Sequence, residues 1–430
     1  MLIPDKISNY INKRASDVWT IENDYSKFFQ KIIVVPSIAE SKNLPSLIKS
    51  LEKNDEIELQ NTLLIIEVNN AVSSTDEVKE DNKKTLEYLR ILSTKLNLSF
   101  VDTCSAGKEM DDKNAGVGLA RKIGMDLALT KFDYNSSDKR ILICTDADCT
   151  VDTNYLSKIS REVNKNDFET AVVNFAHDIS GDDEETKAII SYELFLRYYV
   201  LGLRYAGSEY AFHTIGSTMI CTPEAYAKVG GMNKYKAAED FYFLEKLAKV
   251  YPIGEIKSTF VHPSKRSSWR VPFGTGRSVD RYLSNIKDEY QLYDPKCFTT
   301  LKNWLEVFYD RSLSQLELVS SSINIIKNIH PSLFDFLSQQ NFENFVKKVL
   351  LNNKNHSEIE KQKHYWFDAF KTLKLIHYLR DTVYPNINMF IAIDELLKLM
   401  NVKHNIKRDS QIPDLETQKE YLLLLRKIQS

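Results

Sequence analysis

Short runs of aliphatic residues alternate with helical patterns through the first two thirds of the chain. Ile32 to Val35 is a continuous apolar run that ends at Pro36, and a helical spacing of apolar residues follows from Leu44 to Leu51. Such a run is typical of a strand that is buried on both faces. The alternation predicts an α/β fold with a doubly wound, mostly parallel sheet. The same pattern predicts further strands at 63–66, 100–101, 141–143 and 256–261, and further helices at 86–96 and 119–129.

The predicted sheet indicates where a ligand would bind. In open α/β sheets, ligands bind in the crevice outside the carboxyl ends of the strands. The residues that directly follow Val35, Val68 and Ile143 are therefore candidates for a binding site before any motif is considered.

The last third of the chain has a different composition. All 13 glycines lie between Gly107 and Gly276, so the tail lacks the residue type that most readily adopts a positive φ. Apolar residues from Tyr365 to Tyr378 recur at the spacing of one amphipathic helix. Because one core seldom extends beyond about 250–300 residues, we expect more than one domain. The predicted division is an N-terminal helical extension at 1–30, an α/β domain at 31–285 and an all-helical C-terminal domain at 286–430.

Composition argues against several classes of protein. The chain has 57 Lys and Arg residues against 59 Asp and Glu, and a net charge of −2 provides no positive field for binding nucleic acid. The five cysteines include no CxxC pair, which predicts neither a disulfide framework nor a cysteine zinc site. Residues 1–16 lack the apolar segment of a signal peptide, and no stretch has the length and apolar character of a transmembrane segment. We expect a cytoplasmic protein, for which peripheral membrane contact stays open.

Two carboxylates follow the strand predicted at 141–143. Asp146 and Asp148 are separated only by Ala147, at the point where the chain leaves the sheet. Hard divalent ions such as Mg²⁺ and Mn²⁺ prefer oxygen ligands and keep open positions for substrate phosphates. This spacing is also common in surface turns, so it indicates a metal site only when other motifs accompany it.

Two further motifs accompany the carboxylate pair. Upstream, small residues open the predicted helix that carries Arg121, which leaves room for a ligand near the backbone. Downstream, a turn at Gly230-Gly231-Met232 precedes Glu239-Asp240, an acidic helix start. Acidic residues at a helix start are also favoured by the helix dipole alone, which is the structural alternative.

The order of these elements resembles glycosyltransferase family 2, whose members have the GT-A fold. The resemblance covers residues 30 to 280, and several elements in one order are more specific than any single motif. It identifies the α/β domain at 31–285 as a GT-A catalytic domain. The matching elements are Val34-Val35-Pro36 followed by Glu40, Asn114-x-Gly116 with Ala120-Arg121, Asp146-Ala147-Asp148, Gly230-Gly231-Met232 and Glu239-Asp240.

The resemblance implies transfer of a sugar from a nucleotide-diphosphate donor of the UDP or GDP type to a hydroxyl acceptor. Asp148 would bind a divalent ion, Mn²⁺ or Mg²⁺, while Asp146 would lie nearer to the ribose of the donor. Asp240, beside Glu239, would be the catalytic base that takes the acceptor's proton, which implies inversion at the anomeric carbon. The other donor-binding residues that the resemblance implies are Pro36, Glu40, Asn69, Asn70, Asn114, Gly116 and Arg121.

A histidine and a basic segment follow the strand predicted at 256–261. His262 directly follows this strand, and a similar histidine completes the metal shell in several GT-A enzymes, which makes it a candidate third ligand. A histidine that only packs at a strand end is the alternative. The cations that follow predict a loop that binds donor phosphates or an anionic acceptor, and they are Lys265, Arg266, Arg270 and Arg277.

The chain departs from the family at Asn69-Asn70, where two aspartates are usual and the second commonly contacts the uracil of a UDP donor. Asparagine both donates and accepts hydrogen bonds, so it can still pair with a uracil edge, but the donor base is not fixed.

Three alternatives to an inverting transferase stay open. A retaining GT-A synthase of the glucosyl-3-phosphoglycerate or mannosylglycerate type is favoured by Asp146-Ala147-Asp148 together with His262. A catalytically inactive nucleotide-sugar-binding or scaffold protein would use the helical tail to recruit partners. A nucleotidyltransferase is disfavoured because Pro36 to Glu40 contains no glycine.

Overall fold

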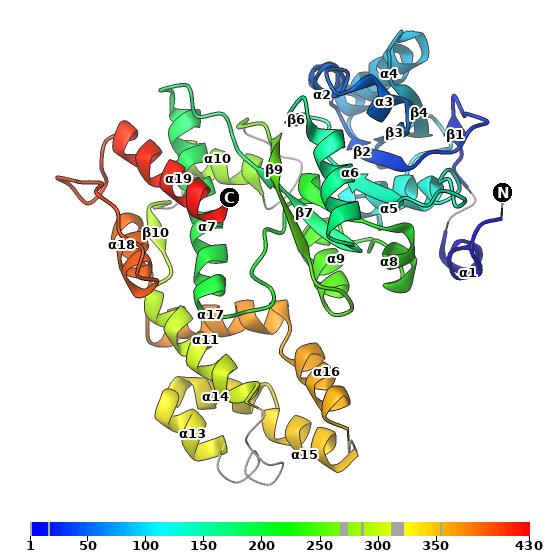
Figure 1. The fold of residues 1–430 in the computed structure, drawn as a ribbon. Helices are drawn as coiled ribbons and strands as arrows, with labels where there is room; N and C mark the ends of the chain where they lie inside the picture. The colour runs from blue at the N-terminus through cyan, green and yellow to red at the C-terminus, as the bar shows by residue number, and fades with distance from the viewer. Residues whose placement is uncertain (1, 16–17, 267–273, 285–287, 311–321, 353–354) are drawn as a thin grey trace. The chain divides into compact units, whose positions relative to one another are not determined.

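The computed structural model describes residues 2–15, 18–266, 274–284, 288–310, 322–352 and 355–430 (Figure 1). It forms two compact units. The first unit contains Met1–Gly181, Thr214–Asp280 and Ser430, and the second contains Asp182–His213 and Arg281–Gln429. The division into independently folding domains at residues 30 and 285 stays a prediction.

The first unit contains a nine-stranded sheet with the order β1-β4-β3-β2-β5-β8-β7-β9-β6. The longer pairings, β2 with β3 and β5, β3 with β4, and β7 with β9, are parallel. The antiparallel pairings join only two or three residues each. The strands are β1 (Ile21–Glu22), β2 (Lys31–Ser37), β3 (Thr62–Asn69), β4 (Asn97–Thr103), β5 (Ile141–Cys144), β6 (Thr150–Val151), β7 (Thr170–Phe175), β8 (Met219–Cys221) and β9 (Gly254–His262).

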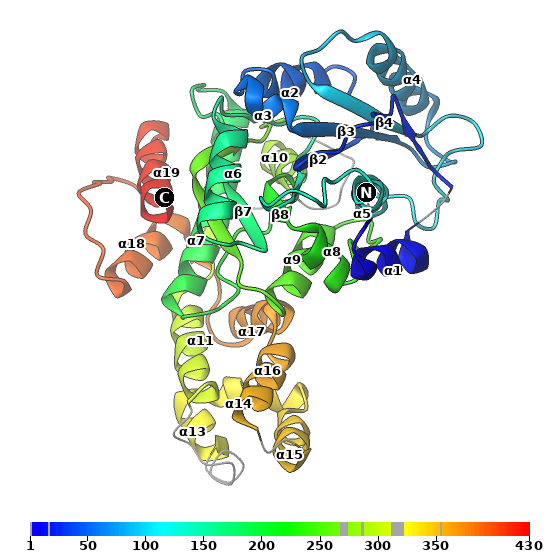
Figure 2. The same ribbon diagram turned by 45° about the vertical axis from the view of Figure 1, so that its right-hand side comes forward.

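Helices cover both faces of this sheet. Apolar residues of α2, α3, α4 and α6 pack on one face around Ile33 and Val35. On the other face α5 lies so close to β2 that a Cβ at Gly124 would be 2.4 Å from Val34 Cγ1. Both views show α2 and α3 on one side of β2 and β3, and α8 and α9 on the other (Figures 1 and 2). The helices are α1 (Asp5–Arg14), α2 (Leu44–Leu51), α3 (Glu56–Gln60), α4 (Asp76–Ile91), α5 (Val117–Ala128), α6 (Tyr155–Lys165), α8 (Pro223–Lys228) and α9 (Glu239–Ala248), with a 3-10 turn η1 (Gly216–Thr218).

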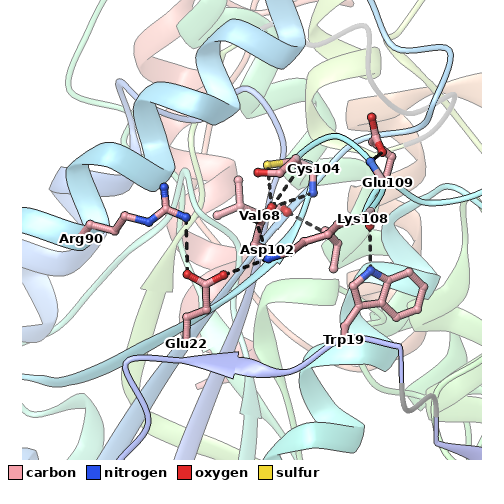
Figure 3. A network of polar contacts seen from close by, with 11 residues as sticks. Trp19, Glu22, Val68, Arg90, Asp102, Cys104, Lys108 and Glu109 are labelled. Atoms are coloured by element: carbon pink, nitrogen blue, oxygen red, sulfur yellow. Dashed lines mark hydrogen bonds and ion pairs between the residues drawn. The ribbon is translucent and has the colours of Figure 1, made fainter.

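The N-terminal segment is only partly helical, which corrects the expected helical extension. After α1 the chain forms β1, which pairs antiparallel with β4 at the edge of the sheet. Glu22 of β1 contacts Arg90 of α4 at 3.4 Å and Lys108 at 3.2 Å, and Lys108 also contacts Asp102 at 3.2 Å (Figure 3). These ion pairs are partly exposed and contribute little stability. Hydrogen bonds beside β1 add to them, since Asn23 donates to the carbonyl of Leu98 at 2.6 Å and the N–H of Leu98 donates to the Tyr25 hydroxyl at 3.1 Å.

The second unit is helical apart from a two-stranded antiparallel sheet, β10 (Gln291–Leu292) with β11 (Ile387–Asn388). Two of its helices, α11 and α14, have Pro295 and Pro331 in the first helical turn, where a missing N–H costs nothing. The helices are α7 (Glu184–Tyr205), α11 (Pro295–Phe308), α13 (Ser322–Ile329), α14 (Pro331–Gln339), α15 (Phe342–Asn352), α16 (His356–Trp366), α17 (Ala369–Thr382), α18 (Met389–Leu399) and α19 (Leu415–Gln429), while α10 (Thr275–Leu283) crosses the division between the units.

The single helix predicted from Tyr365 to Tyr378 is wrong. The structure ends α16 at Trp366 and begins α17 at Ala369. Asp368 has an extended backbone, and its carboxylate accepts a hydrogen bond from the backbone N–H of Lys371 at 3.0 Å. Such a cap starts a new helix, and apolar spacing does not reveal it because the apolar face continues across the break.

The predicted fold class is confirmed, with a large, mostly parallel α/β sheet and a helical C-terminal region. No helix within the described residues combines the length and the apolar character that crossing a membrane requires.

Candidate active site

The carboxylate pair lies on a turn at the carboxyl end of β5. The strand itself is fully buried, and the turn closes where the N–H of Cys149 donates to the carbonyl of Asp146 at 3.1 Å. Ala147 points into the core, while the side chains of Asp146 and Asp148 keep 34% and 26% of their surface exposed. The turn therefore presents both carboxylates to solvent from a rigid strand end.

The second acidic pair begins α9. Ala238, directly before it, has a φ of 58°, which a residue with a Cβ adopts only at a cost. Asn233 holds this turn by donating from its amide to the carbonyl of Glu239 at 2.8 Å. The helix start buries Glu239 and leaves Asp240 half-buried. Strained backbone that is held by its surroundings is typical of functional sites.

Arg121 of α5 joins the two acidic motifs. Its Nη2 contacts Asp146 Oδ1 at 2.6 Å and its Nε contacts Glu239 Oε1 at 3.0 Å. Burial lowers the pKa of this guanidinium, but Asp146 and Glu239 more than compensate and hold its pKa well above the usual value. Gly216 provides the space, since a Cβ there would lie 2.3 Å from Nη2. Arg121 was predicted to lie beside the nucleotide, and the structure places it, fully buried, as a link between two carboxylates.

The carboxyl of Asp240 has a raised pKa. Burial raises the pKa of its carboxyl to about 7, and the neighbouring charge of Glu239 adds to the effect. The N–H of Phe241 donates to Asp240 Oδ1 at 2.7 Å and partly opposes this shift. A carboxylate with a pKa near the working pH both accepts a proton and releases it again readily.

Asp148 and Glu40 share one arginine. Arg266 Nε and Nη2 contact Asp148 Oδ2 at 3.0 and 2.9 Å, and Nη2 also contacts Glu40 Oε1. Burial and the charge of Asp146 raise the pKa of Asp148, whereas Arg266 lowers it. The amide of Asn43 donates to Glu40 Oε2 at 2.7 Å and fixes the position of Glu40. The structure thus brings three predicted site residues into direct contact.

His262 lies at the end of β9 but contacts a different acidic residue. Its Nδ1 is 2.9 Å from the carbonyl oxygen of Ala176, and its Nε2 is 2.8 Å from Asp152 Oδ1. Because each ring nitrogen faces an oxygen acceptor, binding a metal would require the ring to leave Asp152. The role of His262 as a third ligand stays a prediction.

The other predicted cations are less closely connected to this site. Arg277 of α10 pairs with Asp280 at 2.6 Å, and Lys265 is half-buried. Arg270 lies outside the described residues, so the predicted basic loop is described only at its two ends.

The start of α5 is covered by the protein itself, which corrects the expected room for a ligand. A Cβ at Gly116 would lie 2.7 Å from Lys236 Cα, and a Cβ at Gly118 would lie 2.3 Å from the carbonyl oxygen of Tyr235. The N–H of Gly118 also donates to that carbonyl at 3.2 Å. Because these positions are glycine, the segment before α9 can pack directly against the start of α5. Asn114 is half-buried, and its amide donates to Asp111 Oδ2 at 3.3 Å.

The predicted base-reading residues are buried at the carboxyl end of β3. The amide of Asn69 donates to Glu67 Oε2 at 2.7 Å and to the carbonyl of Ser37 at 3.2 Å. Asn70 accepts at its side-chain oxygen from the amide of Asn82, 3.0 Å away. Pro36 lies in β2 opposite Glu67. A role of these residues in reading the donor base stays a prediction.

Sequence reasoning missed two buried acids beside these asparagines. Glu67 interrupts the apolar run of β3, and this interruption is a signal that was available from the sequence. Burial raises its pKa to about 8, against the opposing hydrogen bonds of Thr103 and Asn69. Asp102, at the end of β4, accepts from the backbone N–H groups of Cys104 and Ser105 at 3.2 and 2.9 Å (Figure 3).

The described residues contain no group of three or more His, Cys, Asp or Glu side chains placed to hold a metal ion. Asp148 and Glu40 nevertheless both contact one cationic side chain, Arg266. Two carboxylates fit a hard divalent ion whose other positions are filled by water and donor phosphates.

No protein-family model matches this chain, and no curated protein matches it. Among solved structures, residues 1–349 of TarS from S. aureus, in complex with UDP-GlcNAc, are 14% identical with a TM-score of 0.39, and the match covers 77% of this chain and 89% of that chain. The mannosyltransferase PcManGT from Pyrobaculum calidifontis, in complex with GDP-Man and Mn²⁺, is 12% identical with a TM-score of 0.35. This match covers 88% of this chain and 93% of that chain.

Proposed function

We propose that this protein is a glycosyltransferase that moves a sugar from a nucleotide-diphosphate donor to a hydroxyl acceptor. One observation carries the proposal. Arg121 contacts both Asp146 and Glu239, so it joins two acidic motifs that are 93 positions apart in the sequence into one site. The order of motifs that resembles glycosyltransferase family 2 is therefore also an arrangement in space.

Asp240 is the proposed catalytic base. Its carboxylate takes the proton of the acceptor hydroxyl while that oxygen attacks the anomeric carbon of the donor sugar. The bond between the anomeric carbon and the diphosphate oxygen breaks, and the nucleoside diphosphate leaves with the electron pair. In-line attack inverts the anomeric configuration. The pKa of Asp240, about 7, supports this role because the group is then substantially ionised at neutral pH.

Asp148 and Glu40 are the proposed residues that hold a divalent ion, Mn²⁺ or Mg²⁺. When bound, such an ion acts as a Lewis acid and neutralises charge on the leaving diphosphate. Asp146 is held by Arg121, and we assign it to orienting the donor rather than to direct contact with the ion. Glu239 is buried beside Asp240 and positions the base. A UDP or GDP donor is proposed from the family resemblance.

The test is the release of nucleoside diphosphate from a panel of UDP and GDP sugars, with Mn²⁺ and a mixture of hydroxyl acceptors. We expect turnover with at least one donor, and Asp240→Asn should remove it while nucleotide binding is kept. The anomeric configuration of the product, determined by NMR, separates inversion from the retaining alternative. No release with any donor, from folded protein that also fails to bind UDP and GDP, would contradict the proposal.

A further inference from the structure

Arg266 holds a position that a bound cation would take. Its guanidinium contacts Asp148 through two nitrogen atoms at 3.0 and 2.9 Å, and it also contacts Glu40. These are the two carboxylates to which the proposed function assigns the divalent ion. A divalent ion placed between these carboxylates would compete with the guanidinium, because both are cations and Arg266 already contacts Asp148 Oδ2 and Glu40 Oε1.

The two arginines of the site differ in how firmly they are held. The side chain of Arg121 is 3% exposed and lies between Asp146 and Glu239. The side chain of Arg266 is 28% exposed, and of its two partners Asp148 is 26% exposed and Glu40 is 6% exposed. Removing a buried ion from its partners is expensive, whereas a partly solvated ion pair is worth much less. Arg121 is therefore a fixed part of the site, and Arg266 is able to exchange its partner.

We propose that Arg266 is an internal counter-ion that a divalent cation displaces from Asp148 and Glu40, and that the displaced guanidinium then binds the diphosphate of the donor. This inference rests on the proposed function and describes how ligand binding at the same site is regulated. Its consequence is that the metal ion and the nucleotide bind cooperatively.

Charge explains why the two ligands would need each other. A metal ion alone must separate Arg266 from both carboxylates and leave the guanidinium without an anionic partner. When the diphosphate is also bound, the planar guanidinium gains phosphate oxygens, which it binds strongly through paired N–H groups. By thermodynamic linkage, the metal ion must then strengthen nucleotide binding by the same factor by which the nucleotide strengthens metal binding.

The test measures Mn²⁺ binding by calorimetry, without and with saturating UDP or GDP. For the unaltered protein we expect the nucleotide to tighten Mn²⁺ binding within the usual range of allosteric coupling, about 5- to 150-fold. Arg266→Ala should bind Mn²⁺ alone more tightly, by about tenfold, since no counter-ion competes, and the nucleotide should then add much less. Arg266→Lys, which keeps the charge but not the planar fork, should lie between the two.

Arg408→Ala is the matched control. Arg408 contacts Asp394 Oδ2 through Nε at 3.3 Å and Nη2 at 3.0 Å, which resembles the contact of Arg266 with Asp148, but it belongs to the second unit. This variant should bind Mn²⁺ as the unaltered protein does. Circular dichroism of each variant confirms that it is folded.

Two outcomes would overturn the inference and are distinguishable from each other. If folded Arg266→Ala binds Mn²⁺ alone no more tightly and keeps the full effect of the nucleotide, then Arg266 is not the counter-ion, although the proposed function survives. If the unaltered protein binds neither Mn²⁺ with UDP nor Mn²⁺ with GDP, the proposed function fails as well.

Discussion

Two polar clusters lie at the carboxyl ends of strands in the same sheet, and they hold their charged groups in different ways. At the ends of β3 and β4, Glu67 and Asp102 are buried. Glu67 accepts from hydroxyl and amide groups, and Asp102 accepts from backbone N–H groups and from Lys108. At the end of β5, Asp146 and Asp148 are partly exposed and are held by Arg121 and Arg266. The first arrangement stabilises the strand ends, whereas the second keeps carboxylates in contact with solvent, where a ligand can reach them.

This comparison shows that position alone does not define a site. Both clusters lie where a doubly wound sheet binds ligands, and both contain residues that the sequence marks as candidates. The difference lies in the partners. Backbone, hydroxyl and amide donors make most of the contacts of Glu67 and Asp102, whereas arginines hold Asp146 and Asp148. Arg266, on the partly exposed Asp148, is a cation that another cation can replace.

The largest expected effect separates the clusters by activity, because Asp240 is joined to the β5 cluster through its neighbour Glu239 and Arg121. Asp240→Asn should lower kcat by about 10²- to 10⁴-fold with donor affinity nearly unchanged, because only proton transfer is lost. Asp102→Asn, in the other cluster, should keep kcat per folded molecule. In the unaltered enzyme, kcat/KM should rise with pH through about 7, where Asp240 ionises, and then level off. An equal loss of kcat in both variants would remove the distinction between the clusters.

Arg121→Met tests the fixed arginine. It leaves Glu239 buried without its counter-ion, and such a change costs about 3 to 5 kcal/mol of unfolding free energy. Urea denaturation at pH 7 measures this loss. Arg140→Met is the control, because Arg140 and its partner Glu224 are more exposed, and it should cost about 1 kcal/mol or less. Similar costs for the two variants would show that Arg121 is not a structural link.

Glu67→Gln tests the buried acid of β3. Its folded pKa of about 8 lies above the usual 4.5, so its stability contribution is full below pH 4.5 and is lost as the pH rises toward 8. Glutamine does not ionise. The variant should therefore be more stable than the unaltered protein at pH 8.5, by on the order of a few kcal/mol, with a smaller difference at pH 5. Urea midpoints that differ equally at the two pH values would refute a neutral Glu67.

Asp102→Asn has the smallest expected effect and the opposite sign. Burial raises the pKa of Asp102, but hydrogen bonds from Ser105, Cys104 and Lys108 outweigh it and lower the pKa to about 2. Its contribution is therefore present above about pH 4 and is lost as the pH falls to 2. At pH 7 the variant should lose about 2 kcal/mol, and near pH 2 the two proteins should unfold at similar urea concentrations. A loss that is independent of pH would point to packing instead of charge.

The sequence predicted β2, β3 and β5 because strands buried on both faces are continuous apolar runs, but it did not predict β7 at Thr170–Phe175. The strands at Ile32 to Val35 and Ile141 to Ile143 lie inside β2 and β5, and the helix at Leu44 to Leu51 has the bounds of α2. The helices of the C-terminal region were harder to predict, since the break between α16 and α17 at Asp368 depends on one capping side chain and not on periodicity.

The candidate site was predictable only in its residue types. Local motifs predicted the acidic residues Asp146, Asp148, Glu239 and Asp240. The structure shows that Asp146 and Glu239 both contact Arg121. Their partners could not be predicted, because contacts such as Arg266 with Glu40 join positions 226 residues apart. The glycines of α5 show the same limit, since a small residue indicates close packing without indicating what packs there.

The most direct test compares nucleotide binding by Asp148→Asn and Asp102→Asn. Calorimetry with UDP or GDP and Mn²⁺ should show that Asp148→Asn loses metal-dependent binding, because it removes a charged oxygen ligand at the end of β5. Asp102→Asn should bind as the unaltered protein does. Unchanged metal-dependent affinity in folded Asp148→Asn, or equal loss in both variants, would contradict the assignment of the active site to the β5 cluster.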